Sequence, residues 1–81
     1  MNNAKIFKRI KGALDRAEVG GRRSSAEVRI QAIKYADELE GISGKEFCEG
    51  ANIPESYGVE FNKMRKIAPR LKRAGLDVTK L

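Results

Sequence analysis

The sequence predicts an all-α fold, a small helical bundle of four main helices. The chain has 81 residues, which is enough for one small domain and too few for two. Apolar residues make up 41% of it and recur mostly at helical spacing. Serine, proline and glycine signals for helix starts and ends divide this periodic sequence into four stretches.

The first stretch predicts a basic amphipathic helix over residues 3–18. Its apolar stripe is formed by Ile6, Phe7, Ile10, Ala13, Leu14 and Ala17. Lysines and arginines occupy the rest of the circumference. A Gly-Gly-Arg-Arg sequence at residues 20–23 ends the helix and provides a basic connector. We expect residues 1–23 to form this helix and a basic arm.

A second helix is expected over residues 25–39. Ser24 and Glu27 have the spacing of a capping box, in which each side chain satisfies the other residue's backbone N–H. Besides its main apolar face, this helix carries a second apolar strip formed by Ile30 and Ile33. Two strips require two neighbours, so we expect the first helix or a second copy of the chain to cover one of them.

The third helix is short and is expected over Gly44–Ala51. Ser43 and Glu46 repeat the capping-box spacing at its start. Asn52 follows as the non-glycine residue that best tolerates left-handed backbone geometry, so we expect a tight turn of about three residues there. Pro54 suits the first turn of the next helix.

A fourth helix is therefore expected from Pro54 onward. Its apolar positions recur at helical spacing and are Tyr57, Phe61, Met64 and Ala68. We expect Pro69 to interrupt this helix, with a short restart that ends at Gly75. Residues 76–81 form a C-terminal tail, either a packed strand or a frayed end.

Two short helices joined by a turn have the arrangement of a helix-turn-helix. The stretch from Gly44 to Tyr57 resembles the helix-turn-helix DNA-binding domains of bacterial, phage and plasmid regulators. Cys48 matches the small residue that faces the second helix of the motif, and Asn52 matches its turn residue. The motif's apolar positions are matched by Phe47, Ala51, Ile53 and Phe61. The resemblance implies a helix-turn-helix domain over residues 24–75.

Gly58 departs from this pattern, because such motifs usually place a branched apolar residue there to pack against the first helix. Either Tyr57 takes over that contact with a slightly rotated second helix, or the motif is a variant.

The outward face of the fourth helix supplies the candidate base contacts, since the N-terminal half of a recognition helix lies deepest in the major groove. These candidates are Ser56, Val59, Asn62 and Lys63. Glu55 and Glu60 lie nearby, and we attribute both acids to the favourable helix dipole of a first turn. The candidate phosphate contacts are Lys45, Tyr57, Arg65, Lys66, Arg70, Lys72, Arg73, Arg22 and Arg23.

Lysine and arginine gather at both ends of the chain. Residues 1–23 carry seven basic and two acidic residues, and residues 63–81 carry seven basic residues and one acidic residue. Residues 24–62, between them, carry three basic and eight acidic residues. The formal net charge is +6. If the two ends fold side by side, they present one positive surface of the kind that recruits polyanions.

Composition excludes or disfavours several classes of function. The chain has no histidine, and Cys48 is its one cysteine, so zinc sites of the Cys/His type, disulfides and histidine-based acid–base pairs are ruled out within one chain. Glycine spacing matches no phosphate-binding loop, and aromatic residues offer no stacking platform for RNA. We expect no enzyme, no catalytic residue, no metal, no cofactor, no small-molecule ligand, no membrane partner and a cytoplasmic location.

The sequence thus predicts sequence-specific binding of double-stranded DNA by a transcriptional repressor or a plasmid or phage maintenance factor. We expect a bacterial, nucleoid-associated protein that acts as a homodimer or as cooperative copies on repeated sites. The alternative is a protein-binding adaptor or anti-activator built on a helix-turn-helix-like scaffold. An apolar outward face on the fourth helix would favour the adaptor, whereas polar and basic groups there favour DNA.

Overall fold

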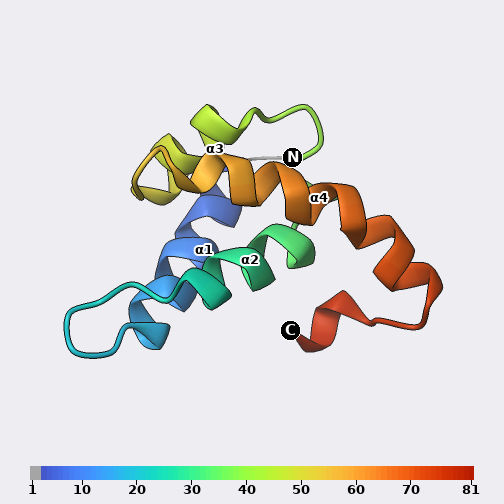
Figure 1. Ribbon diagram of the computed structural model, residues 1–81, viewed down its shortest axis with the longest axis horizontal. Helices are drawn as coiled ribbons and strands as arrows, with labels where there is room; N and C mark the ends of the chain where they lie inside the picture. Colours follow the sequence, from blue (N-terminus) through green and yellow to red (C-terminus); the bar gives the residue numbers. More distant parts are fainter. Residues whose placement is uncertain (1–2) are drawn as a thin grey trace.

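The computed structural model describes residues 3–81 and builds them as four α-helices and a short 3₁₀ helix (Figure 1). The helices are α1 (Asn3–Ala17), α2 (Ser25–Lys34), α3 (Gly44–Ala51), α4 (Tyr57–Arg73) and the 3₁₀ helix η1 (Val78–Lys80). Both α1 and α4 pack against α2 and α3, and η1 lies against α2. The predicted all-α bundle is confirmed.

A row of three aromatic rings crosses the core and links three helices. Phe47 of α3 lies between Phe7 of α1, with ring centroids 6.3 Å apart, and Phe61 of α4, with centroids 4.2 Å apart in a stacked pair. Phe47 and Phe61 are completely buried. The apolar stripe of α1 enters the same core through Ile6, Ile10 and Leu14. This packing places α1 and α4 on opposite sides of α3.

The start of α2 matches the prediction in part. The Ser24 hydroxyl oxygen accepts the backbone N–H of Glu27 at 3.1 Å, as expected of an N-cap. The Glu27 carboxylate does not complete a capping box, because it accepts the side-chain amide of Gln31 at 2.7 Å instead.

The end of α2 differs from the prediction, since the helix stops at Lys34 and not at residue 39. Residues 35–41 continue as irregular turns, which close at Gly41 with a φ of +85°. Three carboxylates follow the last helical residue: Asp37, Glu38 and Glu40. Negative charge is unfavourable at the negative end of the helix dipole, which disfavours a longer helix here.

The expected bounds of α3 are confirmed, and its capping box is complete. The hydroxyl oxygen of Ser43 accepts the Glu46 N–H at 3.1 Å, and the Glu46 carboxylate accepts the Ser43 N–H at 3.1 Å.

α4 begins later and runs further than the sequence indicated. Its first α-helical residue is Tyr57, and Pro54 opens a tight turn ahead of it, in which the Pro54 carbonyl accepts the Tyr57 N–H at 3.1 Å. The expectation that Pro69 interrupts the helix is wrong. Pro69 lies on the exposed side, while its neighbour Ala68 is buried and holds this part of the helix on the core. Figure 1 shows the last turns of α4 bending away from its first part, as an internal proline produces.

A Schellman motif ends the long helix, as the position of Gly75 predicted. Gly75 has a φ of +111°, and the N–H of Leu76 reaches back to the Leu71 carbonyl at 3.0 Å. The tail beyond it is neither a strand nor a frayed end, because η1 packs against α2 and Lys34 donates to the Leu81 carbonyl at 3.3 Å.

Candidate nucleic-acid interface

Residues 52–56 join α3 to α4 as a tight connection that is longer than predicted. Asn52 adopts the left-handed conformation, with φ 56° and ψ 51°, so the expectation drawn from its residue type is confirmed. The N–H of Ile53 then donates to the Cys48 carbonyl at 3.0 Å. The chain thereby reverses direction within a few residues and brings the start of α4 back across α3.

Gly58 is explained by a close approach of the two helices at Gly44. Both glycines are buried. A Cβ at Gly44 would lie 2.7 Å from the Gly58 carbonyl oxygen, and one at Gly58 would lie 3.2 Å from the Gly44 carbonyl carbon. Backbone packs on backbone where related motifs use a branched side chain. The half-buried Tyr57 also packs on the core, so the structure combines both expected alternatives.

The side chains predicted to contact base edges lie on the exposed edge of α4 or, for Ser56, one residue before the helix. Ser56, Asn62 and Lys63 are exposed, and 59% of the surface of Val59 is accessible to solvent. The opposite edge, which includes Phe61, is buried in the core. Packing on one edge therefore leaves the other free for a ligand, and α1 does not cover it, because α1 packs against α2 and α3.

Most of the cations predicted to contact phosphates are exposed. Along α4 these are Lys66, Arg70 and Arg73, and outside it they are Lys45, Arg22 and Arg23. Among residues 3–81 the ion pairs are Arg29–Glu60 and Lys72–Asp37, so these six cations have no acidic partner in this range.

Arg65 has a structural role that the sequence did not indicate. Its guanidinium lies 4.7 Å from the Phe61 ring centroid and donates to the carbonyls of Leu39, at 3.3 Å, and of Ile42. Arg65 thereby provides hydrogen-bond donors to backbone carbonyls in the turns that follow α2. It also donates to the side-chain oxygen Oδ1 of Asn62 at 3.2 Å, which orients that amide.

Two further phosphate candidates also carry contacts inside the molecule. Lys72 forms an ion pair with Asp37. Tyr57 is half-buried and packs against the core.

Comparison with known families agrees with this geometry. Residues 2–74 match the family model described as an HTH-like domain. The chain belongs to the HTH-like domain family. No curated protein and no solved structure matches it. Because the match reaches back over α1, the family domain includes the first helix together with the helix-turn-helix formed by α3 and α4. Membership indicates a function of the DNA-binding type.

One edge of α4 in this HTH-like domain carries an ion pair to α2. Glu60 pairs with Arg29 of α2 at 3.1 Å, in addition to lying in the first turn of α4. The two residues lie 31 positions apart, so sequence spacing carried no signal of the pair. The pairing sets a positive charge beside the carboxylate, which offsets its repulsion of a polyanion near Val59 and Lys63.

Cys48 of the HTH-like domain is a packing residue. Its side chain is 2% exposed, and its thiol donates to the Glu55 carbonyl with a sulfur–oxygen distance of 3.7 Å. Burial, and after it the charge of Glu55, raises the pKa of the Cys48 thiol above its ordinary value. The neutral thiol is the form that the fold favours.

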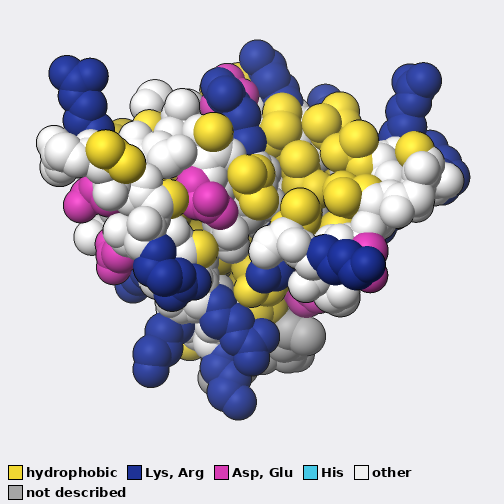
Figure 2. All heavy atoms as spheres, turned by 90° about the horizontal axis from the view of Figure 1, so that it is seen from below, with side chains coloured by type: hydrophobic (Ala, Val, Ile, Leu, Met, Phe, Trp, Pro, Cys, Tyr) yellow, Lys and Arg dark blue, Asp and Glu magenta, His cyan; other side chains and the backbone are white. Residues whose placement is uncertain are grey.

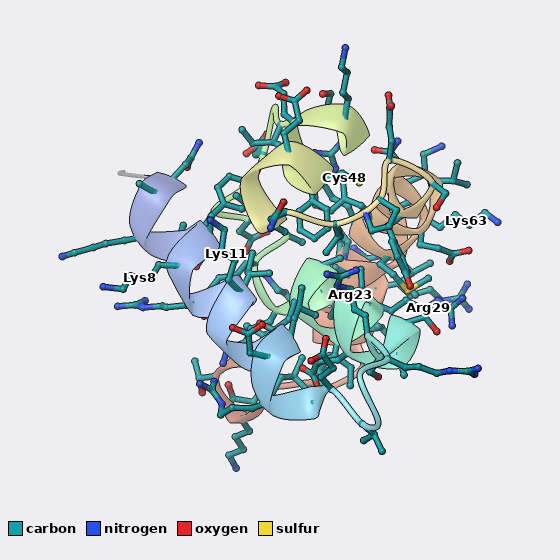
Figure 3. All side chains as sticks on the ribbon, turned by 90° about the vertical axis from the view of Figure 1, so that its left-hand side faces the viewer. Lys8, Lys11, Arg23, Arg29, Cys48 and Lys63 are labelled. Carbon is teal, nitrogen blue, oxygen red and sulfur yellow. The ribbon has the colours of Figure 1, made fainter. Side chains whose placement is uncertain are left out.

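The two basic helices of the HTH-like domain, α1 and α4, do not lie side by side, although the chain end at Leu81 reaches a hollow beside Arg16 and Ala17 of α1. Figure 3 shows Lys8 of α1 on one side of the molecule and Lys63 of α4 on the other. α2 and α3 lie between these helices. The molecule therefore presents two separate basic faces instead of one.

Part of the surface of the HTH-like domain remains apolar. Figure 2 shows hydrophobic side chains gathered on one face, with lysines and arginines at its edge. Ile30 and Ile33 of α2 are half-exposed, and 43% of the surface of Ile67 of α4 is accessible to solvent. Within residues 3–81, no helix combines the length and the apolar character that crossing a membrane requires.

Proposed function

We propose that this HTH-like domain binds double-stranded DNA in a sequence-specific way and acts as a transcriptional repressor or a plasmid or phage maintenance factor. The observation that carries the proposal is the division of α4 into a buried edge and an exposed edge. Phe61 and the Gly44–Gly58 contact fix the buried edge, and the polar exposed edge is free to enter a major groove.

The exposed edge supplies several kinds of base contact. Asn62 can pair with adenine through two hydrogen bonds, and Lys63 can donate to guanine. Val59 can contact a thymine methyl group, and Ser56 can reach either a base or a phosphate. The mixture of chemistries supports readout of sequence over purely electrostatic binding.

Affinity would come from the exposed cations that flank this edge. Lys66, Arg70 and Arg73 follow it along α4, and Lys45 lies at the start of α3. Each phosphate that a cation neutralises releases condensed counterions, which favours binding at low salt. We assign neither Arg65 nor Lys72 to this group, because both already bind acceptors within the molecule.

Two copies on repeated or palindromic half-sites would add the affinity that one motif lacks. The half-exposed Ile30 and Ile33 support a contact between copies. Blocking polymerase is the simplest mechanism for such a protein, which would act at the bacterial nucleoid by binding and without catalysis.

The proposal is tested by selecting bound sequences from a random duplex pool at two salt concentrations. The double variant Asn62→Ala/Lys63→Ala should relax the preference at the contacted bases, with a cost of about 1–3 kcal/mol for each lost base contact. The double variant Arg70→Ala/Arg73→Ala should weaken binding to all duplexes and lower the salt slope by about 1 per cation.

Identical behaviour of the two variants would contradict this division between base and phosphate contacts. Failure of the wild-type protein to bind any duplex would overturn DNA binding itself. It would favour an adaptor that docks a protein partner on exposed apolar side chains, such as Ile30 and Ile33 of α2 or Ile67 of α4.

A further inference from the structure

The basic face of α1 has no role in the function proposed above. Five of its side chains are exposed cations, namely Lys5, Lys8, Arg9, Lys11 and Arg16, and Asp15 is the one acid of this helix. Its apolar stripe is buried in the core, with Ile6, Ile10 and Leu14 at most 4% exposed. An amphipathic helix that binds a membrane surface needs that stripe free, so the exposed feature of α1 is charge alone.

A basic groove runs between α1 and α2. It has a volume of about 410 Å³ and is lined by four cations, Lys8, Arg9, Arg16 and Lys34, without any carboxylate. Gly12 also lines this groove, and a Cβ there would meet the Arg16 side chain at 3.2 Å. The adjoining hollow includes Glu27, whose carboxylate already accepts the Gln31 amide.

Three of these four cations lie in the groove without an ion-pair partner among the described residues. Among residues 3–81, neither ion pair involves Lys8, Arg9 or Arg16. Lys34 donates to an oxygen of Leu81 at 3.3 Å and lies 5.5 Å from the Tyr35 ring centroid. Like charges at short range repel, and a bound polyanion removes this repulsion.

The dimensions of the basic face suit a nucleic-acid backbone. From Lys5 to Arg16 the helix rises about 16 Å, since each residue adds about 1.5 Å. Double-stranded DNA carries roughly one phosphate charge per 1.7 Å of its axis, so a duplex along α1 would offer several phosphates to these cations. Gln31, the polar side chain in the groove, is 4% exposed and bonded to Glu27, so the face offers no base-reading amide.

One straight duplex cannot contact α1 and α4 together, because α2 and α3 separate them (Figure 3). The molecule measures 35 × 24 × 22 Å, and the two faces lie on opposite sides of it. We propose that α1 and the groove beside it bind the phosphate backbone of a second duplex, so that one molecule bridges two DNA segments. This inference rests on the proposed binding of the first duplex by α4.

The test is capture of a second duplex. One duplex is fixed to beads, the protein is added, and a fluorescent duplex of unrelated sequence is then offered. The wild-type protein should retain it. In Lys8→Gln/Arg16→Gln, capture should fall by at least about fivefold, because two cations leave the groove. Binding of a single selected duplex, followed by fluorescence anisotropy, should stay within about twofold of wild type, since α4 is unchanged.

The matched control is Lys8→Arg/Arg16→Lys, which keeps both charges and should keep the capture of the second duplex. Circular dichroism checks that all variants fold, which we expect because both side chains are exposed.

The two proposals fail in different ways in this experiment. Binding of one duplex without capture of another would overturn the second site and leave the role of α4 intact. Undiminished capture by Lys8→Gln/Arg16→Gln would also overturn it, since bridging would then come from two copies that each use α4. Absence of binding to any duplex would overturn both proposals.

Discussion

At the residue scale, two glycines determine how the recognition helix sits on its partner. Gly44 and Gly58 bring the backbones of α3 and α4 together, and the nearest atoms to an added Cβ at Gly44 belong to the backbone of Gly58. Backbone atoms in two packed helices cannot move aside as the end of a flexible side chain can. The contact therefore sets the angle at which α4 presents Val59 and Asn62.

Gly44→Ala should lower the free energy of unfolding by about 1–3 kcal/mol, the usual cost of overpacking a tight contact. Chemical denaturation followed by circular dichroism measures it. Gly12→Ala is the control, because its Cβ would meet the flexible end of Arg16 alone, at 3.2 Å. That variant should gain roughly 0.5–1 kcal/mol from the better helix propensity of alanine. A Gly44→Ala protein as stable as wild type would show that the close approach does not matter.

Single residues were predictable where their role is local. Asn52 was expected in the left-handed conformation from its residue type, and it adopts that conformation. The partner of Gly58 lies in another helix, and the acceptors of Arg65 lie 23 and 26 positions away. Spacing along the chain carries no signal of such contacts. From the sequence, Arg65 was therefore grouped with its basic neighbours and predicted to bind phosphate.

At the element scale, the starts of α2 and α3 and the glycine at the end of α4 followed from the sequence, whereas the end of α2 and the start of α4 did not. Ser24 and Ser43 mark the starts of α2 and α3 because a serine side chain caps the helix that begins beside it. Arg65 of another helix bonds the carbonyls of the turns that follow α2, and Ala68, beside Pro69, is buried. These are tertiary contacts, which local signals do not encode.

Ser43→Ala should lower the free energy of unfolding by about 1 kcal/mol, because it leaves the Glu46 N–H without its cap. Thermal unfolding measures the loss. Ser25→Ala provides the control: Ser25 is an exposed serine at the start of α2 and does not cap it, so its change should stay within about 0.5 kcal/mol of wild type. Equal losses in the two variants would contradict the assignment of the capping box.

At the scale of the whole molecule, the sequence predicted the charge of the chain's ends but not their placement. Seven cations lie in each terminal stretch, and both stretches are strongly basic. Their separation follows from the packing of Phe7 and Phe61 against Phe47, which puts α1 and α4 on opposite sides of α3. Such packing involves residues far apart in sequence, and charge patterns do not report it. Two basic faces are the result, and the bridging proposal depends on them.

The central claim is that the exposed edge of α4 contacts a duplex groove. The most direct measurement is an NMR titration of isotope-labelled protein with one equivalent of a selected duplex. The account predicts that the largest shifts occur at residues 56–66, including the side-chain amide of Asn62, while resonances of α1 move little at this ratio. Unchanged signals at Val59, Asn62 and Lys63, with shifts concentrated on α1 or around Ile30 and Ile33, would contradict it.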